Sequence, residues 1–220
     1  MEGTLVSLLQ SLVIVPATLL PVINPLGIAP IFAAGIGSNR NLASHLARQV
    51  AINSWIIIMV SFLTGSYVLA MFGISLPVVR LGGGLLVAAT AWRMLQSNAE
   101  DEVQAAAAEA SELSTADVVR RTLFPITFPL TTGPGTIAAS IALGAQIPSR
   151  PISFLAESAA AAVGTTIVAL TLYVIFANSA RVLAWLGEVG VLVLTRLMAF
   201  LLLCVGIQIM WTGWAELNGA

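Results

Sequence analysis

Residues 21–30 read Pro-Val-Ile-Asn-Pro-Leu-Gly-Ile-Ala-Pro, and residues 129–136 read Pro-Leu-Thr-Thr-Gly-Pro-Gly-Thr. Each stretch interrupts a long apolar run with proline, glycine and polar side chains. A proline inside a helix removes an amide donor and clashes with the carbonyl one turn earlier, while glycine adds backbone freedom. The sequence therefore predicts two helices that are broken near their middles.

The composition around these two stretches is that of a membrane protein. Of the 220 residues, 58% are hydrophobic and 9% are charged, and the mean hydropathy is +0.98. A membrane span needs about 20 apolar residues, and six stretches are long enough: residues 4–32, 51–72, 78–97, 122–145, 153–177 and 191–214. We predict an all-α polytopic protein with six transmembrane helices, the first and fourth broken at mid-membrane, and no room for a soluble catalytic domain.

An acidic segment divides the chain into two halves. Residues 98–117 hold six carboxylates and no basic residue. We therefore predict a solvated linker between a first three-helix repeat at residues 1–97 and a second at residues 118–220. Arginines near span ends mark the cytoplasmic side of a membrane protein. The first, third and fifth loops hold seven arginines against two in the other loops, which predicts a cytoplasmic linker and two periplasmic termini.

The two halves also resemble each other. Residues 80–86 align with residues 196–202 at an offset of 116, because both begin with arginine-leucine and end with paired leucines. Residues 21–27 align with residues 129–135 at an offset of 108, with proline first and glycine last. A repeat with an odd number of spans must insert in the opposite orientation to its partner. The pattern predicts two inverted three-helix repeats.

The predicted breaks have a chemical consequence. Lipid cannot satisfy the freed backbone groups, so the breaks should face each other at the centre of the bundle. The half-helices that follow present unpaired amides and a positive dipole end at about residues 27–29 and 135–137, which suits a carboxylate. Freed carbonyls and the Asn24 amide oxygen suit an ammonium group. The sequence thus predicts a pocket for a small zwitterion, and the plainer alternative is that both clusters only kink their helices.

The predicted substrate-binding residues come from both breaks, and the threonines among them add hydroxyls that donate or accept. They are Asn24, Pro25, Gly27, Ile28, Thr131, Thr132, Gly133, Pro134, Gly135 and Thr136.

A second group of residues has a predicted gating or structural role. Arg80 and Arg196 occupy equivalent repeat positions where a loop meets a span, so they either reach the head groups or pair with a carboxylate, Glu188 being nearest to Arg196. Gln208 lies inside the sixth span, where it forms an interhelical hydrogen bond or a cavity wall. Asn53 is a weaker candidate of the same kind in the second span.

Other chemistry is not expected. His45 has no Cys, Asp or Glu partner at ligand spacing, so we predict no metal site and no cofactor. The chain has no plausible nucleophile with a base, and its net charge of −1 does not favour nucleic acid, so we predict neither an enzyme nor a nucleic-acid-binding protein. Glu157 is the best carboxylate for proton coupling, although it fits an interfacial charge equally well. Residues 82–84 are glycines that allow close helix approach, either within one chain or between copies of a homo-oligomer.

Four blocks carry a resemblance to a known family. They are residues 24–27 (NPLG), residues 72–77 with Arg80 and the following glycines, residues 133–138 (GPGTIA), and residues 196–198 with residues 201–206. On these blocks the chain resembles, almost end to end, the MarC family of six-span bacterial inner-membrane proteins.

The resemblance implies a function. The family is distantly similar to the LysE-type amino-acid exporters, and some members resemble transporters of small neutral amino acids such as glycine and alanine. Together with the two predicted helix breaks, this leads us to expect a secondary transporter that works by alternating access, and the resemblance alone implies that it exports its substrate across the bacterial inner membrane. A passive pore or a structural membrane subunit without a saturable substrate site is the alternative.

Overall fold

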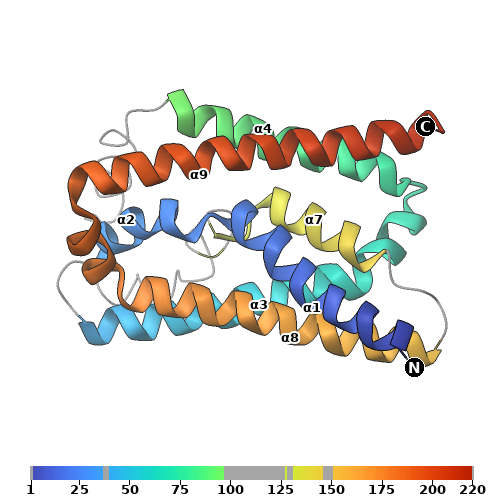
Figure 1. Cartoon of the computed structure of the whole chain (residues 1–220), viewed down its shortest axis with the longest axis horizontal. Coiled ribbons are helices and arrows are strands. Elements are labelled where there is room, and N and C mark those ends of the chain that lie inside the picture. Colours follow the sequence, from blue (N-terminus) through green and yellow to red (C-terminus); the bar gives the residue numbers. More distant parts are fainter. Residues whose placement is uncertain (1, 37–39, 97–126, 128–130, 146–150, 220) are drawn as a thin grey trace.

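The computed structural model describes residues 2–36, 40–96, 127, 131–145 and 151–219, and the regular structure in them is helical. This confirms the predicted all-α class. The helices are α1 (Glu2–Ile23), α2 (Pro25–Ile36), α3 (Arg40–Met71), α4 (Leu76–Gln96), α7 (Pro134–Gly144), α8 (Pro151–Ala177) and α9 (Ser179–Leu217). Figure 1 shows their arrangement.

Four helices contain a stretch long and apolar enough to cross a membrane. These stretches are Arg40–Gly65 in α3, Leu76–Gln96 in α4, Phe154–Ala177 in α8 and Val189–Leu217 in α9. Two shorter apolar helical stretches, Leu12–Ile23 and Pro134–Gly144, accompany them. The predicted acidic linker at residues 98–117 lies outside the described residues.

The helices form three layers (Figure 1). α4 and α9 lie along one side and pack mainly on each other, while α3 and α8 pair along the opposite side. α1, α2 and α7 lie between these pairs, with α1 against α8, α2 against α9, and α7 against both α3 and α4. The two ends of the chain lie at the same end of the molecule.

The largest hydrophobic core joins the middle layer to α3 and α8. On α8, Val168, Leu172 and Phe176 are fully buried at intervals of four residues, so they share one helix face. The Phe176 ring stacks on Phe32 of α2, with ring centroids 4.7 Å apart and planes 16° apart. A separate, smaller cluster of buried residues formed by Val87, Ala91 and Leu202 holds α4 against α9. The α4–α9 pair therefore shares little of the main core.

Glycines let α4 approach its neighbours closely. A Cβ atom at Gly83 would collide with Ala138 of α7, and one at Gly84 would meet the carbonyl oxygen of Gly206 on α9. Small residues at membrane helix interfaces allow this closeness. At Gly82, by contrast, a Cβ would have nothing within 4 Å. Of the two possibilities that the sequence left open, Gly83 and Gly84 serve contacts within one chain.

The outer faces of the helices are apolar, as lipid contact requires. Phe200, Ile207 and Trp211 of α9 are each more than half exposed.

α9 is longer than the predicted sixth span, because it begins at Ser179. The helix bends at Gly187, where φ is 66° and ψ is 171°. A residue with a side chain rarely adopts that conformation, so glycine is needed at the bend.

The close approach of α4 and α9 makes a prediction about two neighbouring glycines. Gly84→Ala should lower the melting temperature, because its Cβ would lie 2.7 Å from the Gly206 oxygen and 2.7 Å from the Met210 nitrogen. Overpacking of this kind costs about 1–3 kcal/mol. Gly82→Ala, two residues away on the same helix, is the matched control and should not destabilise the protein. Thermal melting of both purified variants in detergent measures the difference, and equal melting temperatures would contradict the described packing.

Candidate functional site

The first predicted break lies at Asn24, between α1 and α2. Asn24 has a positive φ of 51°, a conformation that asparagine tolerates better than most residues. Its backbone amide still donates to the Leu20 carbonyl at 2.9 Å, which completes α1. Pro25 then begins α2, where the missing amide hydrogen of proline is not needed. The predicted interruption at this point of the chain is confirmed.

The side chain of Asn24 caps the helix that follows it. Its Oδ1 accepts a hydrogen bond from the Gly27 amide at 3.2 Å, and its main-chain carbonyl accepts one from the Ile28 amide at 3.2 Å. A Cβ at Gly27 would collide with the Asn24 side chain, so the cap requires glycine there. The Asn24 Nδ2 points to the Met94 sulfur of α4 at 3.9 Å.

This cap corrects one expectation. The amides of Gly27 and Ile28 were predicted to be unpaired and open to a carboxylate, and this is wrong because Asn24 satisfies both. Asparagine is a preferred N-cap residue since its side-chain oxygen reaches the amide three residues later.

The second break precedes α7 and is built differently. The Thr132 amide donates to the Thr127 carbonyl at 2.6 Å across five residues, and Gly133 then adopts an extended conformation with φ −78° and ψ 179°. Pro134 begins α7, and no side chain caps this helix start. The first amides of a helix have no partner within the helix, so Gly135 and Thr136 present donors of the predicted kind. Residues 122–126 and 128–130 of the predicted fourth span lie outside the described residues.

The two breaks are neighbours at the centre of the molecule (Figure 1). A Cβ at Gly135 would collide with Val87 of α4 and would lie 3.7 Å from Val22 of α1, two residues before Asn24. The end of α1 and the start of α7 therefore lie next to each other, with α4 covering both.

Most of the predicted binding residues are buried. Asn24, Thr131, Thr132 and Thr136 are at most 4% exposed. The others range from buried to exposed: Pro25, Gly27 and Ile28 are buried, Gly133 and Gly135 are half-buried, and Pro134 is exposed. The start of α7 can thus be reached more easily than the hydroxyls behind it.

Ser54 contacts the second break, although its neighbour Asn53 was the predicted residue. Ser54 of α3 is fully buried and accepts a hydrogen bond from the Thr132 hydroxyl at 2.8 Å, whereas Asn53 is only half-buried. The signal was available, because Val50 and Ile58 are apolar, lie four residues on either side of Ser54, and share its helix face. The structure therefore ties the second break to α3 through Ser54.

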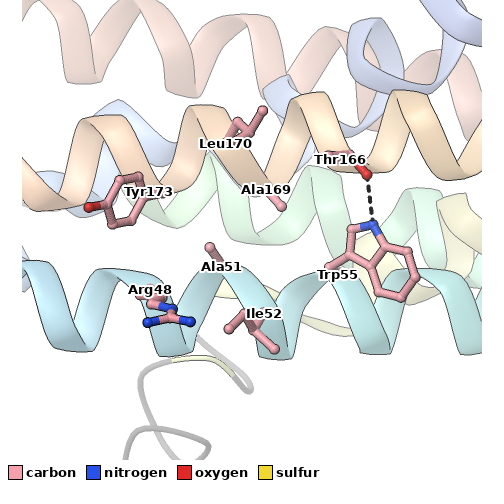
Figure 2. A pocket seen from close by; sticks show the side chains of 8 residues that line it. All are labelled: Arg48, Ala51, Ile52, Trp55, Thr166, Ala169, Leu170 and Tyr173. Atoms are coloured by element: carbon pink, nitrogen blue, oxygen red, sulfur yellow. Dashed lines mark hydrogen bonds between the residues drawn. The ribbon is translucent and has the colours of Figure 1, made fainter.

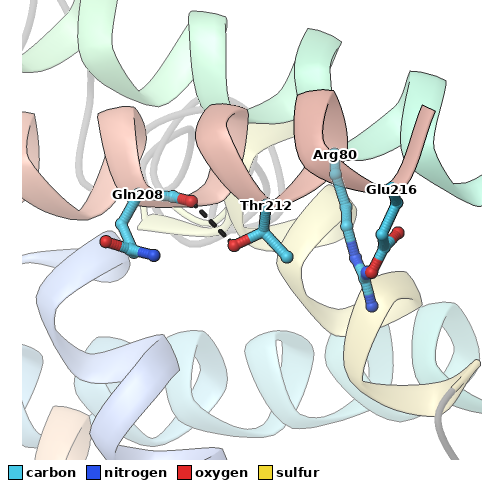
Figure 3. A network of polar contacts seen from close by, with 4 residues as sticks. All are labelled: Arg80, Gln208, Thr212 and Glu216. Carbon is cyan, nitrogen blue, oxygen red and sulfur yellow. Dashed lines mark hydrogen bonds and ion pairs between the residues drawn. The ribbon is translucent and has the colours of Figure 1, made fainter. Parts of the chain in front are cut away.

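Arg80 and Arg196, which align in the sequence, join α4 and α9 at opposite ends. Arg80 is buried and forms an ion pair with Glu216 in the last turns of α9 (Figure 3). Arg196 of α9 donates to the Leu95 carbonyl in the last turn of α4 and lies 3.4 Å from the Met94 carbonyl. Carboxylate pairing, one of the two readings of Arg80, is confirmed with Glu216 as the partner. The side chain of Glu188 lies outside the described residues.

Gln208 belongs to a polar row on α9. Gln208, Thr212 and Glu216 lie four residues apart and project from one side of the helix (Figure 3), and the Thr212 hydroxyl donates to the Gln208 carbonyl at 2.9 Å. Gln208 is exposed, and within the described chain its side chain makes no interhelical hydrogen bond.

Glu157, the candidate for proton coupling, is half-buried near the start of α8. The described residues contain no group of three His, Cys, Asp or Glu side chains that could hold a metal ion.

The cap at the first break makes a graded prediction. Asn24→Gly keeps the positive φ and loses only the side-chain cap, at a cost of a few tenths of a kcal/mol to about 1 kcal/mol. Asn24→Ala loses the same cap and also places alanine in the left-handed region, which alanine tolerates less well than asparagine does. This adds roughly 1–2 kcal/mol to the loss of folding free energy. The melting temperature should therefore fall from wild type to Asn24→Gly to Asn24→Ala. The reverse order of the two variants would show that the backbone conformation at Asn24 is not the constraint.

The ion pair predicts non-additive changes. Glu216→Gln leaves the buried Arg80 guanidinium without its carboxylate, so this variant should melt below the double variant Arg80→Gln/Glu216→Gln. The coupling energy from the double-mutant cycle should be about 0.5–3 kcal/mol. Arg93→Gln removes an exposed arginine at the other end of α4 and serves as the control. Additive effects of the two substitutions would argue against the pair.

Comparison with known proteins identifies the family. A family model described as MarC family integral membrane protein matches residues 9–217. Inner membrane protein MarC of Salmonella typhimurium is 32% identical over 215 residues, covering 90% of this chain and 91% of that protein. The protein of the same name from Escherichia coli O139:H28 is 32% identical over 206 residues with the same coverage. No solved structure matches the chain. Because the family model spans nearly the whole chain and these relatives match it end to end, this protein belongs to the MarC family of integral membrane proteins.

Proposed function

We propose that this protein is a secondary transporter of small neutral amino acids such as glycine or alanine, and that it exports them across the bacterial inner membrane. The observation that carries the proposal is the pair of neighbouring helix breaks at the centre of the molecule, where Gly135 lies beside Val22. Interrupted helices that meet inside a bundle are the usual site of substrate binding in secondary transporters. The inner-membrane location follows the names of the relatives, and the export direction follows the family resemblance.

The proposed topology has six spans in two inverted repeats. α1 with α2 forms the first span, α7 ends the fourth, and α3, α4, α8 and α9 are the others. Each half then contributes equivalent spans that pair with each other, because α3 packs on α8 and α4 packs on α9. The reciprocal contacts of Arg80 and Arg196 with the far ends of α9 and α4 support the same symmetry. Both termini are proposed to be periplasmic, which agrees with their position at one end of the molecule.

The chemistry around α7 suits a zwitterion. The uncapped start of α7 offers amides and a positive dipole end for a carboxylate. Thr131, Thr132 and Thr136 bring hydroxyls to the same place. The Pro21 carbonyl loses its ordinary donor because Pro25 has no amide hydrogen, so an acceptor for an ammonium group lies at the neighbouring end of α1. The site then needs no buried full charge from the protein.

Alternating access is the proposed cycle. The threonine hydroxyls are at most 2% exposed, so a substrate reaches them only when the helices around the breaks move apart. The α4–α9 pair is the proposed moving part, since it has its own small cluster and shares little of the main core. The substrate touches none of the predicted gating or structural residues in this scheme. Arg80, Arg196 and Gln208 support or gate the α4–α9 pair, and Asn53 has a structural role on α3.

The alternative is a passive pore or a structural subunit, in which the breaks only permit close packing. The contact between Gly135 and Val87 is the observation in its favour. A carrier shows saturable uptake that is stimulated by substrate on the opposite side of the membrane, whereas a pore does not. Counter-substrate stimulation of alanine flux therefore separates the two functions.

Variants at the start of α7 test the proposal in reconstituted vesicles. Gly135→Val should abolish alanine flux, because its side chain covers the helix start. Thr136→Val keeps the shape of the residue but loses one hydroxyl, and should raise the KM about tenfold, the effect of a hydrogen bond to a charged group. Thr90→Val is the matched control, since Thr90 is exposed on α4 and its hydroxyl only bonds the Leu86 carbonyl.

Folding must be checked in parallel. Gel filtration and thermal melting should show that each variant inserts and folds like the wild type. Thr136→Val remains informative if Gly135→Val misfolds against Val87. Wild-type alanine flux in folded Gly135→Val vesicles would refute the site.

A further inference from the structure

A groove between α3 and α8 lies away from the two helix breaks. It opens on the side of the molecule and encloses about 550 Å³, a volume in the usual range for small-ligand sites. Its walls are apolar and its two ends are polar (Figure 2). The lining residues are Arg48, Ala51, Ile52 and Trp55 of α3 and Thr166, Ala169, Leu170 and Tyr173 of α8.

The two ends of the groove differ in chemistry. At one end the Trp55 indole nitrogen donates to the Thr166 hydroxyl at 3.1 Å, which links the two helices (Figure 2). At the other end lie the Arg48 guanidinium and the Tyr173 ring, and the Tyr173 hydroxyl shares a hydrogen bond of 3.2 Å with Ser44. The groove thus runs from a cationic end at Arg48, called its mouth, to an uncharged polar end at Trp55 and Thr166.

The mouth lies at the level expected of lipid head groups. α3 has 32 residues and is about 48 Å long, which exceeds the roughly 30 Å of membrane hydrocarbon. The apolar stretch Arg40–Gly65 contains Arg48, but the span predicted from the sequence begins at residue 51, and an arginine one turn before that residue can extend its side chain to the head groups. Tyr173 lies four residues from the end of α8. The apolar walls, seven residues or about 10 Å deep between Arg48 and Trp55, then lie within the hydrocarbon.

The charge at the mouth selects for an anion. Arg48 is exposed, and no carboxylate pairs with it among the residues that the structure describes. A guanidinium binds phosphate oxygens through two parallel hydrogen bonds. A free amino acid does not fit the groove, because its apolar walls offer nothing to a second charge. An acyl chain does fit them.

We propose that this groove binds an anionic phospholipid, with its phosphate on Arg48 and one acyl chain between Ala51, Ile52, Ala169 and Leu170. The lipid belongs to the leaflet next to the α3 start, which is the cytoplasmic leaflet in the topology proposed above. It fills the seam between two spans from opposite halves of the chain and so stabilises their pairing. The site is independent of the transport proposal, because it shares no residue with the helix breaks.

Quenching of Trp55 by brominated lipid tests the site. The other four tryptophans, Trp92, Trp185, Trp211 and Trp214, are more than half exposed and are replaced by phenylalanine. The protein is reconstituted in phosphatidylcholine vesicles that contain a small fraction of either phosphatidylglycerol or phosphatidylcholine with brominated acyl chains. Phosphatidylglycerol should reach half-maximal quenching at about fivefold lower mole fraction, the effect of one arginine near a membrane surface.

Four variants in this background decide the outcome. Arg48→Ala should remove the preference for phosphatidylglycerol, and Arg48→Lys should retain part of it. Ala169→Phe fills the groove and should remove the preference while the cation remains. Arg181→Ala removes an exposed arginine from the start of α9, at the same end of the molecule, and should change nothing.

Several results would overturn the proposal. Equal quenching by the two lipids in the Trp55 background would show that no anionic lipid is selected. An undiminished preference in Arg48→Ala would show that this arginine does not hold the phosphate. A preference that survives in Ala169→Phe would place the acyl chain elsewhere. None of these results depends on amino-acid flux, so failure here leaves the transport proposal standing.

Discussion

The hydrogen bond from the Gly27 amide to the Asn24 side chain allows an apolar helix to be interrupted in the buried interior of the molecule. Lipid offers no partner to a freed amide or carbonyl, so the protein or a molecule bound to it must supply one at every interruption. At the first break Asn24 does this for the amides, because it ends α1 with its own amide and caps α2 with its carboxamide, whereas the Pro21 carbonyl receives no hydrogen bond from Pro25. The residues around it follow from this role: Pro25 has no amide to satisfy, and Gly27 has no Cβ to obstruct the cap.

At the second break the hydrogen bonds come from two places, the distant residue Ser54 and the nearby residue Thr127. The Thr132 hydroxyl bonds Ser54 on α3, and the Thr132 amide reaches back across five residues to Thr127. These contacts fix the turn before α7 but leave the helix start itself uncapped. α7 is held in place by close packing, because a Cβ at Gly144 would collide with the Phe62 carbonyl of α3. α7 is therefore closely packed against α3 at its last residue and uncapped at its first residue.

These two solutions explain what the sequence could predict. Proline and glycine act through the backbone of their own segment, so their positions located the interruption at Asn24 and the start of α7. A helix cap or an ion pair depends on two residues, and the sequence reveals it only when the two residues are close along the chain. The Asn24 cap could have been found from its spacing of three residues to Gly27, but the partnership of Arg80 with Glu216 spans 136 residues and has no local signal. Ser54 is a third case, since a polar residue on a buried face is recognised only from the helical spacing of its apolar neighbours Val50 and Ile58.

The difference between the breaks also bears on the proposed substrate. Two equivalent repeats with two open helix ends would offer two anion sites facing one another, and would favour a dicarboxylate or two bound monocarboxylates. Here the start of α2 is occupied by Asn24, while the start of α7 remains open. One open dipole end beside the terminal carbonyls of α1 matches one carboxylate and one ammonium group. The capping of α2 by Asn24, with α7 left uncapped, is therefore consistent with the single small amino acid proposed as the substrate.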